Sequence, residues 1–216
     1  MTKEKRTVLI ETLNFVKGAM KDDSTGHDWL HVSRVLNNAK KIGSFEKADM
    51  YVVQLAAMLH DISDRKLNGG DEEAGPRRAA EWLTGMGVDR QVIEQVTDIM
   101  RGISFNGAGS AEAELSIEGQ IVQDADRLDA IGAVGIARAF AYGASAGRVM
   151  YDADVKPRMH ASAEEYKNSA SPTINHFYEK LLLLKDRMHT KTGKILAEPR
   201  HKFLEDFLKQ FYREIE

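Results

Sequence analysis

The feature that most restricts the fold is an apolar segment, residues 48–59, that ends directly in His60 and Asp61. Apolar side chains occupy nearly every position of this segment, so a helix formed by it has no face for solvent and must be surrounded by other elements. Two interpretations of the His-Asp pair stay open at this point. His60 is a core histidine bonded to a backbone carbonyl while Asp61 caps a turn, or both are ligands of a divalent metal, because imidazole and carboxylate groups suit Mn, Fe, Zn and, less well, Mg.

A metal shared by the pair needs ligands from elsewhere in the chain. Adjacent helical residues point about 100° apart, so His60 and Asp61 can hold one ion only if other helices approach them. The helix predicted over residues 27–43 carries His27 and His31, which are four residues apart and therefore on one helix face. Taken alone, this pair is equally well explained as two surface histidines.

Acidic residues on a later helix are the next candidates. The apolar spacing predicts one long helix over residues 117–144, in which Asp126 lies at the edge of the buried stripe and Asp124 is turned well away from it. A buried carboxylate requires a cation. That cation is either a metal ion or an arginine such as Arg127 or Arg138.

The rest of the chain follows the same helical period, and no segment alternates polar and apolar residues as a half-buried strand does. The sequence therefore predicts an all-α protein with a single domain over residues 1–216. Its core, at about 24–142, carries the candidate site, and C-terminal helices at about 172–216 pack on it. Residues 143–171 are predicted to be irregular, as a lid over the site or as a loop without a role. The other predicted helices span 5–21, 76–83, 90–103, 173–190 and 194–216, the last broken or kinked near its start by Pro199.

Composition excludes several kinds of function. The chain of 216 residues is 43% hydrophobic and 29% charged, as expected for an ordinary soluble globular protein. It has no cysteine, which excludes disulfides, thiolate zinc sites, iron-sulfur clusters and cysteine nucleophiles. A net charge of -3 gives no electrostatic footprint for nucleic acid, and there is neither a membrane-spanning run nor a secretory signal. We expect a cytoplasmic protein without nucleic-acid or membrane partners, and its oligomeric state stays open.

Four stretches together carry a resemblance to a known family. HDWLHVSRV, LAAMLHDISDRK and IVQDADRLDAIG, followed by SPTINHFYEKLLLL, resemble the HD-domain metal-dependent phosphohydrolase superfamily, and in particular its small bacterial members. The resemblance implies an HD-type helical bundle and a divalent metal cofactor, with Mn, Mg or Fe expected. Of the two His-Asp dipeptides in the chain, the family pattern matches the one that closes the buried helix. The implied metal ligands are His31, His60, Asp61 and Asp126.

Further residues are candidates for contacts with water or substrate. Asp64, one helical turn beyond His60, is either a group that orients water or acts as general base, or a surface carboxylate. Lys66, His27 and Lys180 are candidates to bind phosphate oxygens. His176 lies four residues before Lys180, so the two would share one face of the predicted helix.

The resemblance implies hydrolysis of a phosphate ester or anhydride in a small phosphorylated metabolite, with a nucleotide or nucleoside triphosphate as the expected substrate and phosphate or pyrophosphate as the product. Four protein ligands leave positions on the metal for water and a phosphate oxygen. Two alternatives remain: a non-catalytic helical protein that senses a metal or ligand, and a helical interaction module with a structural His-Asp network.

Overall fold

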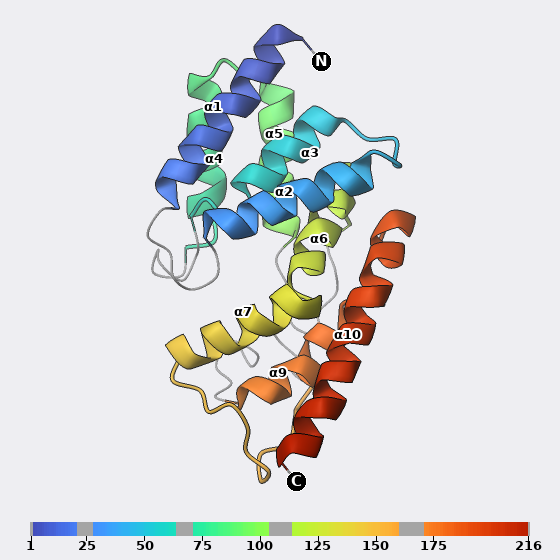
Figure 1. Cartoon of the computed structure of the whole chain (residues 1–216). Helices are drawn as coiled ribbons and strands as arrows, with labels where there is room; N and C mark the ends of the chain where they lie inside the picture. Colours follow the sequence, from blue (N-terminus) through green and yellow to red (C-terminus); the bar gives the residue numbers. More distant parts are fainter. Residues whose placement is uncertain (1, 21–27, 64–70, 104–113, 160–170, 216) are drawn as a thin grey trace. The chain divides into compact units, whose positions relative to one another are not determined.

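The computed structural model describes residues 2–20, 28–63, 71–103, 114–159 and 171–215 (Figure 1). These residues form α-helices and one short 3-10 helix, and no strand occurs among them, which confirms the predicted all-α class. Within these ranges, no helix is both long and apolar enough to cross a membrane. The contacts divide the described chain into two compact units, the first ending at Ala125 and the second beginning at Asp126. A single domain over residues 1–216 stays a prediction.

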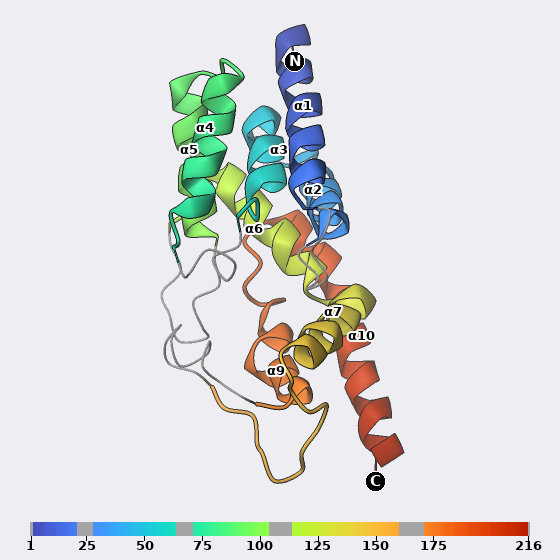
Figure 2. The same cartoon turned by 90° about the vertical axis from the view of Figure 1, so that its left-hand side faces the viewer.

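The first unit is built around the apolar helix that dominates the sequence. Helix α3 contacts α1, α2 and α5, and eight of its ten residues are buried. Figure 2 shows α3 lying between α1 and the pair formed by α4 and α5. The prediction that this helix is enclosed by other elements is therefore confirmed. The helices of the unit are α1 (Lys3–Ala19), α2 (Trp29–Gly43), α3 (Met50–Leu59), α4 (Ala74–Gly85), α5 (Arg90–Gly102) and all but the end of α6 (Ile117–Asp129).

Aspartate caps determine where three of these helices begin. The carboxylate of Asp28 accepts a hydrogen bond from the backbone N–H of His31 at 2.9 Å, and α2 starts at the next residue. Asp49 and Asp89 cap α3 and α5 in the same way. Such a side chain satisfies one of the backbone N–H groups that a helix leaves without a partner at its start. The cap of α2 therefore places His31 in the first turn of that helix.

The second unit contains the end of α6 together with α7 (Gly132–Ser145), α9 (Thr173–Glu179), the 3-10 helix η2 (Leu181–Leu183) and α10 (Lys191–Ile215). Helix α7 contacts both α9 and α10. Three aromatic rings pack where these helices meet: Phe140 lies 5.9 Å from Phe177 and 6.0 Å from Phe207, and the last two are stacked at 5.6 Å between ring centroids. These rings form part of the apolar core of the unit.

The long helix predicted over residues 117–144 is wrong, because the structure has two helices there. Ile131 is extended, with φ -123° and ψ 164°, and Gly132 has a positive φ of 77°, which few residues other than glycine adopt without strain. Across this corner, Arg138 on α7 forms an ion pair of 2.6 Å with the buried Asp129 on α6. The apolar spacing continues through the corner and therefore gave no sign of the break.

The helix predicted over residues 173–190 ends early. Helix α9 stops at Glu179, and Lys180 leaves the helical conformation with φ -143° and ψ -59°. The burial expected for this segment is nevertheless found at Ile174, Phe177, Leu181, Leu184 and Met188. A run of four leucines can be buried by 3-10 turns as well as by an α-helix, so burial was predictable here and backbone conformation was not.

Pro199 does not break the last helix. Helix α10 runs from Lys191 to Ile215 with Pro199 inside it. Proline removes one hydrogen bond from a helix interior, but burial of Ala197, Leu204 and Leu208 on both sides of it holds the helix in place. The expectation of a break at this position is therefore wrong, and a kink stays a prediction.

Candidate metal centre

Three polar side chains of the first unit converge where α2 and α3 meet. His31 lies in the first turn of α2, His60 is the C-terminal cap of α3, and Asp61 follows it in a turn. The Nε2 atoms of the two histidines are 3.2 Å apart. An oxygen of Asp61 lies 3.3 Å from Nε2 of His31 and 3.5 Å from Nε2 of His60.

The cluster is enclosed except at Asp61. The side chains of His31 and His60 are 0% and 3% exposed, whereas that of Asp61 is 25% exposed. Water and small solutes can therefore reach the cluster on the side of the carboxylate. A site that is closed by protein except for one polar edge can hold an ion and still accept a ligand from solvent.

A backbone carbonyl fixes the tautomer of His60. Its Nδ1 lies 3.0 Å from the carbonyl oxygen of Ala57. A carbonyl can only accept, so Nδ1 is the protonated nitrogen, and in the neutral ring Nε2 presents a lone pair to His31 and Asp61. The two interpretations of His60 are thus compatible, because the carbonyl bond expected for a core histidine is also the bond that orients a metal-ligating one.

Asp126, the fourth predicted ligand, lies on α6. It follows Ala125 on the same continuous helix, and that helix belongs to the first unit through Ala125. One ligand atom from each of His31, His60 and Asp126 lies within 4.8 Å of the other two, so among the described residues these three form a group that could hold a metal ion. Imidazole nitrogen and carboxylate oxygen are the donors that divalent Mn, Fe and Zn accept. The residues present therefore fit the metal that the sequence implies.

Asn38 helps to position α6 beside α2, and its role was not predicted from the sequence. Its side-chain amide donates to the carbonyl oxygen of Ala125 at 3.3 Å and so ties α2 to α6 one residue before Asp126. Asn38 lies seven residues, or about two helical turns, after His31. A polar residue at that spacing from a candidate ligand was the signal in the sequence that could have identified it.

The position of Asp124 corrects another expectation. We expected it to face away from the buried stripe of its helix, but it is 0% exposed. Helix α6 is therefore enclosed on more sides than an amphipathic helix at the surface. Arg138, one of the arginines considered as a partner for Asp126, pairs with Asp129 instead. Arg127 donates to the carbonyl oxygen of Arg187, and its guanidinium lies 3.2 Å from Nε2 of His189.

The other predicted site residues are not brought into this cluster by any described contact. His27, Asp64 and Lys66 lie outside the described residues. His176 and Lys180 belong to the second unit. The backbone N–H of Lys180 donates to the carbonyl of His176 at 3.0 Å, but the φ of -143° at Lys180 turns its side chain from the helical direction. The expectation that these two side chains share a helix face therefore loses its basis, and their role in binding substrate stays a prediction.

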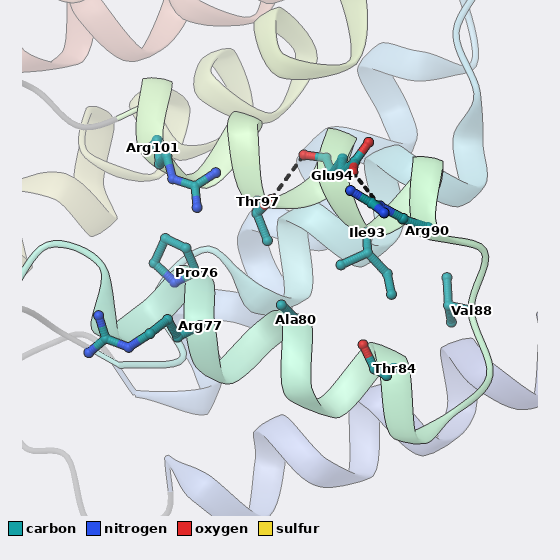
Figure 3. Close-up of a pocket in the computed structure, with 10 residues that line it drawn as sticks. All are labelled: Pro76, Arg77, Ala80, Thr84, Val88, Arg90, Ile93, Glu94, Thr97 and Arg101. Atoms are coloured by element: carbon teal, nitrogen blue, oxygen red, sulfur yellow. Dashed lines mark hydrogen bonds and ion pairs between the residues drawn. The ribbon is translucent and has the colours of Figure 1, made fainter.

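An open groove of about 490 Å³ lies on the hairpin of α4 and α5, apart from the residues of the metal centre (Figure 3). Small and apolar side chains such as Ala80, Ile93 and Thr97 line it. At its edges, Arg90 pairs with Glu94 at 2.8 Å and Arg101 donates to Glu73 at 3.0 Å. Each arginine thus has its own carboxylate. None of the predicted site residues lines this groove, and it offers no set of metal-binding donors.

Comparison with known proteins assigns the family. Residues 29–131, which include all four predicted metal ligands, match the model of the HD domain. YpgQ of Bacillus subtilis (strain 168), described as uncharacterized, is 42% identical over 202 residues, which cover 93% of this chain and 90% of YpgQ. The structure of YpgQ in complex with ADP has a TM-score of 0.76 and covers 98% of this chain and 96% of its own, at 36% identity.

Two other solved structures are similar over nearly the whole chain. An HD-superfamily hydrolase from Bacillus thuringiensis is 40% identical, with a TM-score of 0.75 and coverage of 97% of both chains. A protein from Lactobacillus plantarum is 34% identical, with a TM-score of 0.88 and coverage of 99% of this chain and 98% of its own. The chain belongs to the HD-domain phosphohydrolase superfamily, as the resemblance in its sequence predicted.

Proposed function

We propose that this protein is a metal-dependent phosphohydrolase that cleaves a phosphate ester or anhydride of a nucleotide. The observation that carries the proposal is the convergence of ring nitrogens from His31 and His60 with carboxylate oxygens from Asp61 and Asp126. The complex of YpgQ with ADP supports a nucleotide as the ligand class. We expect Mn, Mg or Fe as the metal and a cytoplasmic location.

The protein groups have separate tasks in this proposal. The carbonyl of Ala57 holds the proton of His60 on Nδ1 and so keeps Nε2 available as a ligand. Asp61 and Asp126 supply two negative charges to balance a divalent cation. When bound, such a cation lowers the pKa of a coordinated water and polarises a phosphoryl oxygen. The partial exposure of Asp61 gives the substrate an approach to this chemistry.

Substrate contacts are proposed at residues outside the cluster. Asp64, four residues after His60 in the sequence, orients water or accepts its proton as a general base. His27, Lys66, His176 and Lys180 supply positive charge or N–H donors to the phosphate oxygens. Such local contacts are needed because a chain with a net charge of -3 does not attract anions as a whole.

The proposal is tested by stripping the purified protein of metal with a chelator and then adding back Mn²⁺, Mg²⁺ or Fe²⁺. Each form is assayed against nucleoside mono-, di- and triphosphates and against phosphate esters that are not nucleotides. Phosphate and pyrophosphate are detected separately, so that the bond cleaved is identified. We expect hydrolysis that depends on metal and is absent in His60→Ala.

The other outcomes point to the alternatives. Metal uptake without hydrolysis of any compound would favour a non-catalytic metal or ligand sensor. A protein that takes up no metal at all would contradict the proposed site and favour a structural His-Asp network.

A further inference from the structure

Asp61 is held differently from the other three candidate ligands. His31 and Asp126 lie within helices, and His60 caps one, whereas Asp61 follows α3 in a turn and is outside the hydrogen-bond ladder of the helix. After it, the backbone N–H of Ile62 donates to the carbonyl of Leu59 at 3.0 Å. The direction of the Asp61 side chain therefore depends on whatever else holds this turn.

Arg78 on α4 supplies a second anchor. Its Nη1 atom donates to the backbone carbonyl of Ile62 at 2.9 Å. Ile62 is only 3% exposed, and a charged donor makes a stronger hydrogen bond than a neutral one. Helix α3 fixes the chain immediately before Asp61, and Arg78 fixes it immediately after.

The guanidinium of Arg78 is itself oriented by its neighbours. It lies 5.4 Å from the ring centroid of Phe15 on α1, within the range of a cation–π contact. Phe15 stacks on Trp82 with 4.1 Å between centroids and 4° between planes. The indole N–H of Trp82 donates to the hydroxyl of Thr12 at 3.0 Å, and Thr12 is fully buried. This series of contacts connects the turn that carries Asp61 to α1 and α4.

We propose that Arg78 is a positioning residue of the metal centre, which acts through the carbonyl of Ile62 to keep Asp61 beside His31 and His60. The inference rests on the proposed metal site and extends it to a residue that neither touches the metal nor belongs to the family motif. Loss of the Arg78 contact lets the turn move, so Asp61 spends less time in the geometry that the ion requires.

The neighbouring arginine offers a matched control. Arg77 is on the same helix and carries the same charge, but it lines the groove between α4 and α5 (Figure 3). It pairs with Asp71 at 2.5 Å. Its side chain is 57% exposed. Arg77→Ala therefore removes an equal charge and volume from α4 without touching the turn after α3.

The experiment measures the dissociation constant of Mn²⁺ by calorimetry on metal-free protein, without nucleotide. We expect Arg78→Ala to raise this constant about tenfold, equivalent to ~1.4 kcal/mol, and Arg77→Ala to change it less than about twofold. Arg78→Lys should restore part of the affinity, because lysine keeps the charged donor but loses the planar contact with Phe15. If Arg78 had a purely structural role, Arg78→Ala would lower the melting temperature of the metal-free protein and leave the dissociation constant of Mn²⁺ unchanged.

The possible results distinguish the positioning role of Arg78 from the proposed metal site itself. Wild-type affinity in Arg78→Ala would overturn the positioning role and leave the proposed function intact. A wild-type protein that binds no Mn²⁺ would overturn both. If circular dichroism shows that Arg78→Ala does not fold, Arg78→Gln takes its place, because the neutral amide of glutamine is too short to reach the carbonyl of Ile62. Wild-type affinity for Mn²⁺ in Arg78→Gln would equally overturn the proposal.

Discussion

In the first unit, the cluster of His31, His60 and Asp61 differs from the groove between α4 and α5 in how its charges are placed. At the groove, each arginine faces a carboxylate: Arg90 pairs with Glu94, and Arg101 pairs with both Glu73 and Asp98. All of these side chains are between 45% and 91% exposed. Exposed pairs of this kind contribute little to stability and have no need of a further ligand.

The metal centre has the opposite arrangement. Ring nitrogens and carboxylate oxygens, all of which can donate a lone pair, point at one another within a largely buried space. Burial of such groups is unfavourable unless a metal cation or a hydrogen-bonding proton is shared among them. The placement of charges, rather than their number or the presence of a groove, distinguishes the candidate metal centre from the exposed ion pairs at the groove.

The strongest test of this difference removes side chains from each group. We expect His60→Ala and Asp61→Ala each to abolish metal-dependent hydrolysis, by more than about 100-fold, because loss of a direct ligand should exceed the effect known for outer contacts. Circular dichroism should show that both variants remain helical. Arg90→Ala at the groove is the control and should keep full activity. Full turnover in either ligand variant would show that the metal assignment is wrong.

Two of the three aspartates on α6, Asp124 and Asp126, allow metal binding to be tested separately from burial. Asp126→Asn should remove hydrolysis and Mn²⁺ binding, because Asp126 belongs to the convergent group. Asp124→Asn should instead lower the melting temperature while Mn²⁺ affinity stays near that of the wild type, because Asp124 is fully buried but is not in that group. If Asp124→Asn lost as much Mn²⁺ affinity as Asp126→Asn, the assignment of Asp126 rather than Asp124 as the ligand would fail.

A variant of Lys180 tests whether the positive charge proposed to bind substrate acts independently of the ligands that hold the metal. We expect Lys180→Ala to raise the Michaelis constant for a nucleotide about tenfold or more, in line with the ~1.5–3 kcal/mol of hydrogen bonds to charged groups. Metal occupancy should not change. Lys185→Ala is a matched control, since Lys185 lies in the same unit and pairs with Glu198. An unchanged Michaelis constant in Lys180→Ala would mean that this lysine does not contact substrate.

The helices and the family were predictable from the sequence because they depend on patterns spread over many residues. The uninterrupted apolar character of residues 48–59 predicted an enclosed helix, and the order of His31, His60, Asp61 and Asp126 predicted the family. The break at Ile131 and Gly132 and the end of α9 before Lys180 were missed, because each depends on the dihedral angles of only one or two residues. The burial of Asp124 was missed because periodicity shows one face of a helix and not how many neighbours surround it.

The smallest effect is expected at the groove and concerns pH. The hydrogen bond from Arg101 holds the pKa of Glu73 below its ordinary value of 4.5. A carboxyl with a lowered pKa in the folded state stabilises the fold at pH values above its unfolded pKa, and this stabilisation is lost as the pH falls through the folded pKa. Arg101→Ala should therefore lower the melting temperature at pH 7 by less than about 3 °C, because the pair of Arg101 and Glu73 is exposed. The difference in melting temperature between this variant and the wild type should shrink below pH 4.5. Mn²⁺ affinity should be unchanged in this variant, and a large loss of it would show that the groove and the metal centre are coupled rather than independent.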